Sequence, residues 1–486
     1  MCGIFSYFLK YLQKSMEVKG GWCYNKSISD HIGRVQHMKK RRGLTTAQVL
    51  IIGFLAVILI GASLLHLPVA SRSGEAIPFL DCAFTAVSAT CVTGLIVVDT
   101  AITWSGFGQA VILVMIQIGG LGFMTLAVML SSLMRRRVSA RERVLLANSY
   151  NLISFEGLMP FVRRIFGGTL LIELCGAIAL AFRFIPRFGW GKGIWYSVFH
   201  SVSAFCNAGF DLMGTESGSF TSLTSFARDP LINVTIALLI MIGGIGFVVW
   251  DDILYWIKER RRFSVYTKLV LTVSAVLWIG GALIVAIPEW NNPATLGPME
   301  PWEKVMASVF QSVTFRTAGF NTIALDSMHM LPKMVSVIIM FIGGASGSTA
   351  GGVKVGTFGL LIYSAVLYAC GRKHITVFRR TVPTADVVRV FTLVTVQICV
   401  TMIGAFFLIG DGADLMAALF ETFSASATVG LSLGLTPTLS AASRWIVMIL
   451  MFFGRVGILT IATLLNDKEV QERNQMQYAE THLMIG

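Results

Sequence analysis

The sequence predicts an all-α integral membrane protein with eight transmembrane helices, arranged as four helix–pore-loop–helix repeats around a pseudo-fourfold pore. Two observations predict this fold class. First, 55% of the 486 residues are hydrophobic, 13% are charged and the mean hydropathy is +0.72, which leaves too little polar surface for a soluble domain. Second, one short segment recurs four times at nearly equal spacing. Apolar runs of about the 20 residues that a spanning helix needs are Val49–Leu65, Val111–Leu130, Leu231–Trp250, Leu269–Ile287 and Val390–Ile409.

The net charge is +13, and the distribution of the basic residues indicates a membrane topology rather than a nucleic-acid partner. Basic residues gather in segments that would all lie on one side of an alternating helix path, and cytoplasmic loops carry such an excess of Lys and Arg. We therefore expect a multi-pass protein of the cell (cytoplasmic) membrane, embedded in the lipid bilayer with both termini cytoplasmic. No cleavable signal peptide is evident. The basic clusters are Arg34–Arg42, Arg135–Arg143, Lys258–Lys268 and Arg372–Arg380.

The recurring segment runs from a Phe through a stretch containing Ser or Thr to one Gly, which Leu or Phe follows. The four glycines are 115, 110 and 111 residues apart, and four matches at such regular spacing indicate an internal repeat. An apolar run precedes each copy and a glycine cluster follows it, so the unit is outer helix, pore helix, polar loop and inner helix. The copies are Phe84–Leu95, Phe199–Phe210, Phe310–Phe320 and Phe420–Leu431, and their glycines are Gly94, Gly209, Gly319 and Gly430.

Four repeats and two short ends account for the chain. Irregular backbone at membrane depth is tolerated only inside protein or beside water, so four re-entrant loops are best satisfied together around one axis. A repeat-built transporter without an axial conduit is the alternative. The expected parts are a cytoplasmic N-terminal segment at 1–44, repeat 1 at 45–134, repeat 2 at 135–262, repeat 3 with a broken inner helix at 263–380, repeat 4 at 381–466 and a cytoplasmic tail at 467–486.

The polar loops suit a dehydrated cation. Rings of neutral backbone carbonyls can replace the hydration shell of potassium, and glycine reaches the positive φ that turns carbonyls toward one axis. No Asp or Glu lies in the filter stretches 90–94, 205–209, 315–319 and 426–430, which argues against an acidic-ring calcium or sodium channel. We predict K⁺ as the transported ion, bound by the backbone carbonyls that precede each glycine, with no catalytic residue. The predicted filter residues are Thr90, Cys91, Val92, Thr93, Gly94, Phe205, Cys206, Asn207, Ala208, Gly209, Phe315, Arg316, Thr317, Ala318, Gly319, Ser426, Ala427, Thr428, Val429 and Gly430.

Arg316 is the charged residue within these filter segments. A cation on the axis would repel potassium, so we expect its guanidinium to lie behind the filter and to pair with a carboxylate, for which Glu421 is a candidate. His200 and Cys206 lack matching metal ligands nearby, so packing roles are expected for both. The hydroxyls expected to cap or tether the pore helices belong to Ser88, Ser203, Thr314 and Ser424.

The filter segments, read in order, resemble those of the Trk/Ktr/HKT superfamily of potassium transporters. The resemblance covers residues 45–466 and is strongest to a bacterial Ktr-type membrane subunit, because residues 1–44 lack the extra helix pair of Trk-type members. That family associates a glycine in every filter with potassium preference, so the resemblance implies potassium uptake. The motifs that carry it are TCVTG (Thr90–Gly94), NAGF (Asn207–Phe210), RTAGFN (Arg316–Asn321) and TVGLSLG (Thr428–Gly434).

The resemblance also implies partners. Ktr-type subunits form homodimers with a pore in each chain, and they are regulated by a cytoplasmic ring of nucleotide-binding subunits that is a separate polypeptide. The nucleotide is thus expected on the partner and not on this chain. Na⁺ is expected as a modulator, and a sodium-coupled or sodium-permeable cation symporter is the alternative function.

The third inner helix contains ten consecutive small residues, GGASGSTAGG, at Gly343–Gly352. Each glycine costs about 1 kcal/mol relative to alanine in a helix, and an unbroken helix from Met334 to Cys370 would be about 55 Å long, against a hydrocarbon core of about 30 Å. We therefore expect a loop below the filter that blocks the conduit and moves aside, as the family resemblance also implies. A close helix-packing patch is the alternative.

Two intramembrane cations accompany this loop, and such residues usually face water or a partner. Arg455 is expected to hold the loop shut through its freed carbonyls or through the loop serines. For Lys354 a gating role and snorkelling to the cytoplasmic surface are both open. The predicted gate residues are Gly343, Gly344, Ser346, Gly347, Ser348, Thr349, Gly351, Gly352, Lys354 and Arg455.

An enzyme is not expected. The seven histidines show no metal-ligand spacing, no nucleophile motif accompanies them, and the eight cysteines include no C-x-x-C pair.

Overall fold

The computed structural model describes residues 46–457, except for 123–124, 126–128, 130–157, 373–374 and 379. This part of the chain is mainly helical. The predicted N-terminal segment at 1–44 and tail at 467–486 lie outside the described residues, as do the basic clusters Arg34–Arg42 and Arg135–Arg143.

Four long helices coincide with the predicted outer helices. Within the described ranges they are the helices long and apolar enough to cross a membrane unbroken. Many of their large apolar side chains are exposed, as expected for helices that face lipid. They are α3 (Thr46–Leu65), α9 (Leu158–Phe188), α14 (Val265–Glu289) and α18 (Thr384–Gly410).

Shorter helices follow each outer helix. The helices at the predicted pore-helix positions, called here the pore helices, are α4 (Phe79–Cys91), α10 (Trp190–Phe205), α15 (Pro301–Thr314) and α19 (Leu415–Ala427). The inner helices are α6 (Gly106–Leu121), α12 (Pro230–Gly244), α16 (Met330–Phe341) and α20 (Ala441–Val456). The remaining elements are α5 (Thr100–Thr103), α11 (Gly214–Ser217), α13 (Phe247–Glu259), α17 (Val355–Ala369), η1 (Pro68–Ala70), η2 (Thr224–Phe226), η3 (Thr436–Thr438) and the antiparallel strands β1 (Thr376–Val377) and β2 (Arg380–Thr381).

Polar caps fix where inner helices begin. The side chains of Ser105, Asp229 and Ser440 accept hydrogen bonds from N–H groups in the first turns of α6, α12 and α20, which have no partner inside the helix. The N-cap of α16 is His329. In all four inner helices the first glycine of the downstream cluster follows the N-cap by 14 residues. The caps therefore place the four glycine clusters at equivalent distances along the inner helices.

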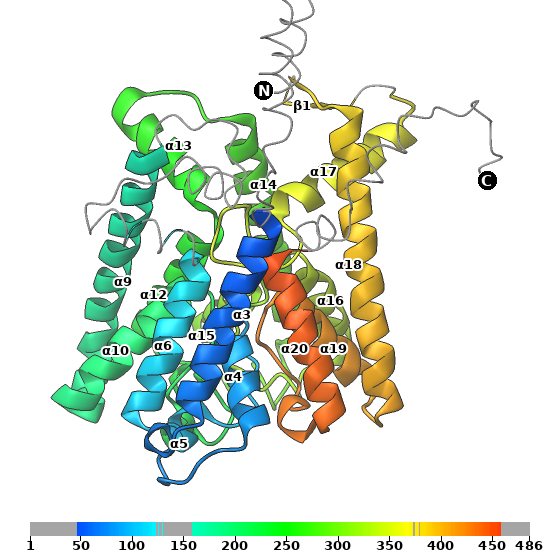
Figure 1. Cartoon of the computed structure of the whole chain (residues 1–486). Helices are drawn as coiled ribbons and strands as arrows, with labels where there is room; N and C mark the ends of the chain where they lie inside the picture. Colours follow the sequence, from blue (N-terminus) through cyan, green and yellow to red (C-terminus); the bar gives the residue numbers. More distant parts are fainter. Residues whose placement is uncertain are drawn as a thin grey trace, which may run out of the picture. The chain divides into compact units, whose positions relative to one another are not determined.

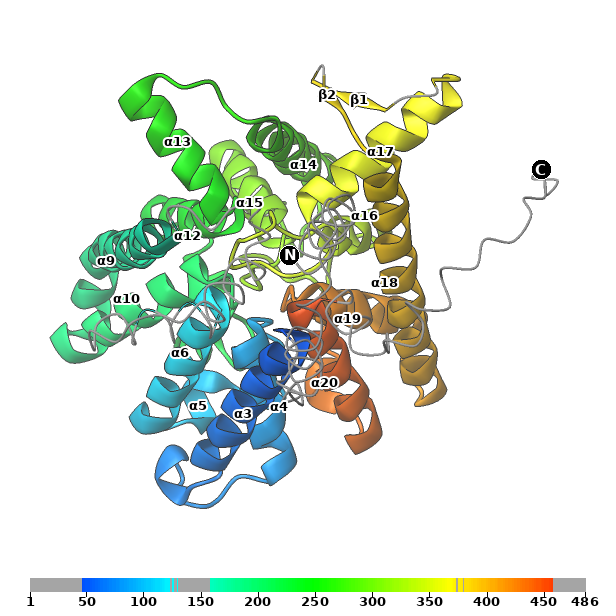
Figure 2. The same cartoon turned by 45° about the horizontal axis from the view of Figure 1, so that its top comes forward.

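The helices of the four predicted repeats pack in cyclic order (Figures 1 and 2). Each outer helix packs on the pore helix that follows it in sequence. Each inner helix packs on the pore helix of the next repeat: α6 on α10, α12 on α15, α16 on α19, and α20 on α4. The last contact joins the end of the described chain to its beginning, so the set closes on itself.

The inner helices stop at their glycine clusters. Gly122, Gly246 and Gly457 follow α6, α12 and α20 with φ of 79°, 93° and 87°, a conformation that glycine adopts without a steric penalty. The run Leu231–Trp250, which we predicted as one span, is therefore two helices, α12 and α13, bent by 96°. Helix breaking, expected for the third inner helix, thus also affects the second.

The first glycine of three clusters touches the end of a pore helix. A Cβ at these glycines would lie about 2 Å from a backbone oxygen of the pore helix, far closer than a side chain can approach, so the inner helix reaches the pore helix only because no side chain is present. The distance from the added Cβ to the backbone oxygen is 2.1 Å for Gly119 and Thr90, 2.0 Å for Gly243 and Phe205, and 2.2 Å for Gly454 and Ser426.

We predict that Gly243→Ala destabilises the protein by about 1–3 kcal/mol, because the added methyl group forces α12 away from the Phe205 carbonyl. Thermal unfolding of the purified protein measures the effect. Gly280→Ala in α14 is the matched control, since a Cβ there meets nothing within 4 Å and alanine is favoured over glycine in a helix by about 0.5–1 kcal/mol. Equal melting temperatures for the two variants would contradict the packing argument.

Candidate functional site

The four glycines of the repeated segment meet in space. A Cβ at Gly94 would lie 3.1 Å from the Cα of Gly209, and one at Gly209 would lie 2.7 Å from the Cα of Gly319. The corresponding distance is 3.4 Å from Gly319 to Gly430 and 3.0 Å from Gly430 to Gly94. These residues form a closed ring in sequence order, called here the glycine ring. Repeats 2 and 4 therefore lie opposite each other across it.

Each ring glycine also lies against a carbonyl of the neighbouring repeat. A Cβ on the glycine would come within 2.0–2.9 Å of that oxygen, where no side chain fits. Glycine is thus required both for its φ, which is 69–96° at the four positions, and for the space it leaves. Each glycine and the residue that supplies the neighbouring carbonyl oxygen are Gly94 with Ala208, Gly209 with Ala318, Gly319 with Val429, and Gly430 with Thr93.

A second left-handed residue precedes each ring glycine by two positions, which the sequence analysis did not predict. A positive φ is uncommon outside glycine and strained for β-branched side chains, and three of these four residues are β-branched. Left-handed residues at alternate positions turn the intervening peptide planes, so that carbonyls along the segment can face the same side. The residues and their φ are Val92 at 58°, Asn207 at 60°, Thr317 at 62° and Thr428 at 53°.

The hydroxyls expected to cap or tether the pore helices bind the glycine segments that follow those helices. In repeats 1 and 4, Ser88 and Ser424 accept a hydrogen bond of 3.1 Å from the N–H of the ring glycine. In repeats 2 and 3, Ser203 and Thr314 donate to the carbonyl of the residue after the glycine, at 2.7 and 2.6 Å. The strained backbone is therefore fixed by its own pore helix in every repeat.

Some of the carbonyls that we predicted as ion ligands have protein partners here. The Phe205 oxygen accepts from the Thr349 hydroxyl at 3.1 Å, and the Ser426 oxygen accepts from Gln397 at 3.0 Å. Both residues lie in the last turn of a pore helix, where the carbonyls have no partner within the helix. In this structure these two carbonyls are not free to bind an ion.

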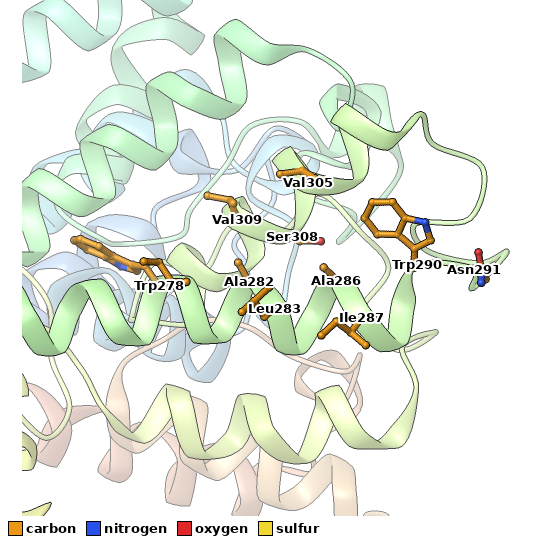
Figure 3. Close-up of a pocket in the computed structure, with 11 residues that line it drawn as sticks. Trp278, Ala282, Leu283, Ala286, Ile287, Trp290, Asn291, Val305, Ser308 and Val309 are labelled. Atoms are coloured by element: carbon orange, nitrogen blue, oxygen red, sulfur yellow. The ribbon is translucent and has the colours of Figure 1, made fainter.

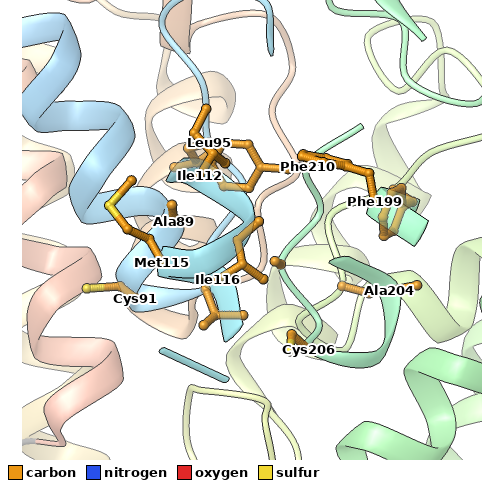
Figure 4. Close-up of a cluster of buried hydrophobic side chains, with 14 of the residues drawn as sticks. Ala89, Cys91, Leu95, Ile112, Met115, Ile116, Phe199, Ala204, Cys206 and Phe210 are labelled. Atoms are coloured by element: carbon orange, nitrogen blue, oxygen red, sulfur yellow. The ribbon is translucent and has the colours of Figure 1, made fainter. Parts of the chain in front are cut away.

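Apolar side chains pack behind the first two filter segments. Figure 4 shows apolar side chains of α4, α6 and α10 there, together with the buried thiols of Cys91 in α4 and Cys206 directly after α10. His200 packs among aromatic rings, accepts from the Leu212 N–H at 3.3 Å and lies 2.7 Å from the Tyr196 carbonyl. These contacts agree with the packing roles predicted for His200 and Cys206.

Glu173 lies in the middle of α9 and was not singled out from the sequence. Its carboxylate accepts from Gln117 at 3.2 Å, and the Cys206 sulfur is 3.9 Å away. The signal that could have found it is an acid within a long apolar run, because such residues are costly in a membrane and often functional.

The Arg316 side chain is buried, and its partner is not the expected carboxylate. Its guanidinium donates to the Gly343 carbonyl at 3.1 Å and lies 5.1 Å from the centre of the Trp278 ring. Glu421 is not its partner, because that carboxylate accepts from Ser432 and Thr436 of its own repeat. A backbone carbonyl freed by the broken helix takes the place of the expected carboxylate.

Residues 343–352, called here the inner loop, separate α16 from α17 and are not helical. The loop is held by main-chain hydrogen bonds to the break between α12 and α13. The Ala345 N–H donates to the Gly244 carbonyl at 2.9 Å, and the Phe247 N–H donates to the Gly347 carbonyl at 2.9 Å. Each segment thus supplies hydrogen-bond partners for backbone N–H and C=O groups that lack a helical partner at the other segment's break. Inside a membrane, such groups must be satisfied by the protein itself.

The inner loop passes directly below two opposite filter segments. The Thr349 hydroxyl donates to the Phe205 carbonyl and lies 3.3 Å from Oδ1 of Asn207, both in repeat 2. Two residues later, a Cβ at Gly351 would lie 2.0 Å from the hydroxyl of Thr428 in repeat 4. Because repeats 2 and 4 are opposite in the glycine ring, the loop crosses from one side of the ring to the other.

Both predicted gate cations bind carbonyls of this region. Arg455 donates to the carbonyl of Thr349 in the loop and to those of Gly119 and Gly120 in α6. Lys354 donates to the Ala350 carbonyl at 2.7 Å. Carbonyls were one of the two kinds of partner expected for Arg455; the hydroxyl of the loop residue Ser348 donates to the Ala345 carbonyl at 2.7 Å.

A groove of about 720 Å³ between α14 and α15 is a poor candidate for ion chemistry (Figure 3). Nine of its eleven lining residues are apolar, and several, such as Ile279 and Ile287, are largely exposed. The groove belongs to the apolar outer surface of the helices and lies away from the glycine ring.

The family model described as TrkH, cation transport protein, matches residues 29–475. The Ktr system potassium uptake protein B of Bacillus subtilis is 41% identical over 445 residues, which cover 91% of this chain and 97% of the relative. The potassium/sodium uptake protein NtpJ of Enterococcus hirae is 39% identical, over 92% of this chain and 99% of the relative.

Comparison with solved structures shows the same fold. The crystal structure of the potassium transporter TrkH from Vibrio parahaemolyticus has a TM-score of 0.68 and 18% identity, over 88% of this chain and 86% of that one. These relatives are ion transporters and not enzymes. Together with the apolar helices of this chain, they identify it as a multi-pass membrane protein. The chain belongs to the TrkH family of cation transport proteins.

Proposed function

We propose that this protein takes up potassium across the cytoplasmic membrane through the glycine ring. The observation that carries the proposal is that every ring glycine lies against a peptide oxygen of the next repeat. Neutral carbonyl oxygens can replace the hydration shell of a potassium ion, and no acidic residue lies at 90–94, 205–209, 315–319 or 426–430. The names of the relatives, which specify potassium or potassium and sodium uptake, support the same ion.

The proposed conduit runs along the axis of four repeats with eight spanning helices, at 45–134, 135–262, 263–380 and 381–466. The cyclic packing of pore and inner helices supports this arrangement. Basic residues at Lys258–Lys268 and Arg372–Arg380 support a cytoplasmic position for the end of the conduit that faces the inner loop, and for both termini.

The inner loop is the proposed gate. It lies across the ring between repeats 2 and 4, and Thr349 and Ala350 within it are buried. Its position depends on cations of other segments, since Arg455 holds Thr349 and Arg316 holds Gly343. A loop that is bound by side chains rather than built into a helix can move aside when those contacts break.

The proposed assembly is a homodimer with a pore in each chain, regulated by a separate cytoplasmic ring of nucleotide-binding subunits. The name of the Bacillus subtilis relative, a lettered protein of a Ktr system, supports partner subunits in general. Sodium is proposed as a modulator, and the potassium/sodium name of one relative favours sodium permeation or coupling as the second candidate function.

Ion flux into liposomes tests the proposal. We expect the purified protein to carry potassium and rubidium well and sodium poorly. Potassium flux should not require sodium in the solution that supplies the potassium. Gly94→Ser places a Cβ 2.5 Å from the Ala208 oxygen, so we expect it to lower the ratio of potassium to sodium flux about tenfold or more.

Gly74→Ser is the control for this experiment, because Gly74 also has a positive φ of 77° but a Cβ there meets nothing within 4 Å. Its flux ratio should equal that of the original protein. Potassium flux that requires sodium would support the symporter instead, and an unaltered ratio in Gly94→Ser would count against the glycine ring as the filter.

Arg455→Ala tests the gate. Hydrogen bonds to charged groups contribute about 1.5–3 kcal/mol each, and this change removes those to the carbonyls of Thr349, Gly119 and Gly120. We expect basal potassium flux to rise about tenfold or more. Arg444→Ala, on the same helix but bound to Asp81, should not raise it. Unchanged or lower flux from well-folded Arg455→Ala protein would refute the role of Arg455.

A further inference from the structure

The sequence KERRR at residues 258–262, called here the arginine segment, ends α13 and begins the connection to α14. Figure 2 shows α13 running from α12 toward the edge of the helix bundle. The four cations of the segment are exposed, and within the described residues none of them forms an ion pair. They are Lys258, Arg260, Arg261 and Arg262.

The two aspartates of α13 are engaged inside the protein and do not neutralise the arginine segment. Asp251 accepts two hydrogen bonds from Arg164 of α9, at 2.8 and 3.0 Å. Asp252 accepts from the Ser264 N–H at 3.2 Å and from the Thr267 hydroxyl at 2.5 Å. These contacts attach α13 both to α9 and to the start of α14.

Large apolar side chains are exposed beside these cations. Leu254 and Ile257, about one turn apart on α13, have 41% and 58% of their surface exposed, and Trp256 has 42%. The Arg260 guanidinium lies 5.9 Å from the centre of a Trp256 ring. Membrane topology accounts for the cations alone, whereas exposed apolar side chains among them are typical of a helix that lies in a membrane interface.

The arginine segment lies between two residues that hold the inner loop. Phe247, the first residue of α13, donates its N–H to the Gly347 carbonyl at 2.9 Å. Tyr266, in the first turn of α14, donates its hydroxyl to the Ser346 carbonyl at 3.2 Å. A ligand that fixes the arginine segment therefore also fixes two contacts of the loop.

We propose that the arginine segment, together with Leu254, Trp256 and Ile257, binds anionic phospholipids of the cytoplasmic leaflet, and that the bound lipid stabilises the docked inner loop. Guanidinium groups match phosphate with paired hydrogen bonds, and clustered cations on an amphipathic helix are attracted to an anionic leaflet. Lipid is favoured over a protein partner because the segment leads directly into α14, a spanning helix with many exposed apolar side chains.

This inference rests on the proposed function for the side of the membrane and for the role of the inner loop, and it adds a ligand and a regulatory site. A ligand that binds one state of the loop better than the other shifts the loop toward that state. The arrangement of α13 in this structure coincides with a docked loop, so lipid bound to it favours the docked state.

Photo-crosslinking tests the lipid site in the full-length protein, reconstituted without any partner subunit. Liposomes of phosphatidylcholine contain a trace of photoactivatable phosphatidylglycerol or of photoactivatable phosphatidylcholine, and mass spectrometry measures the labelling of residues 254–263. We expect the anionic probe to label this region about fivefold or more over the neutral probe, since that is the effect of about one basic residue near an anionic surface.

Three paired substitutions make the test specific. Arg261→Gln with Arg262→Gln should lower the preference for the anionic probe about fivefold or more. Arg261→Lys with Arg262→Lys keeps the charge and should keep the preference. The matched control is Arg72→Gln with Lys192→Gln, which removes two exposed cations that follow the other ends of α3 and α9, and it should leave the preference unchanged.

Hydrogen exchange in nanodiscs tests the link to the loop. The reporter is the Phe247 amide, which donates to the Gly347 carbonyl of the docked loop. We expect its exchange to slow about fivefold or more when phosphatidylglycerol replaces phosphatidylcholine, which is the lower end of the usual coupling between two sites. In the protein with Arg261→Gln and Arg262→Gln, exchange should be equal in both lipids.

The outcomes separate this inference from the proposed function. Equal labelling by the two probes, or a preference that survives the loss of both arginines, overturns the lipid site and leaves the segment to a protein partner. Exchange of the Phe247 amide that is equal in both lipids overturns the link to the loop. Potassium flux in the same liposomes tests the proposed function by itself, since a protein that conducts potassium but shows no lipid preference refutes the lipid site alone.

Discussion

The close approach of a peptide oxygen to a glycine Cα, repeated four times in a circle, is the constraint on which the rest of the structure depends. Each oxygen belongs to one repeat and each glycine to its neighbour, so the position of every segment is set by the next. A side chain at any ring position would push two repeats apart. The pore helices, their tethering hydroxyls and the interrupted inner helices all serve to bring four strained segments to the same centre.

The inner loop shows how a membrane protein satisfies a broken helix. Non-helical backbone at membrane depth needs partners for its N–H and C=O groups, and here four different segments supply them. The break between α12 and α13 exchanges hydrogen bonds with the loop, while Arg316, Lys354 and Arg455 bind its carbonyls. Cations that would repel potassium if they lay free on the axis are thereby engaged at the edge of the loop.

The positions of the helices and loops along the chain could be predicted from the sequence, whereas many contacts between them could not. The outer helices, the glycine segments and the inner loop follow from apolar runs and a repeated motif, which are local signals. The left-handed conformation of Val92 could not be predicted, because a β-branched residue has no preference for it and only the surrounding structure imposes it. The partner of Arg316 was equally hidden, since the carbonyl of Gly343 becomes available only through a helix break 27 residues away. By contrast, the 14-residue distance from N-cap to glycine is visible in the sequence once the caps are known.

The proposed filter and the inner loop contact the same carbonyl oxygen, which has a physical consequence for the proposed function. Phe205 ends the second pore helix and supplies a carbonyl next to the filter, yet the same oxygen binds Thr349 of the loop and lies against Gly243 of α12. A movement of α12 therefore acts on both at once, because the oxygen, the loop and the inner helix are in mutual contact. Selectivity and gating cannot be adjusted independently in such an arrangement. Any partner that acts on α13, across the 96° bend from α12, would act on the Phe205 carbonyl by the same contacts.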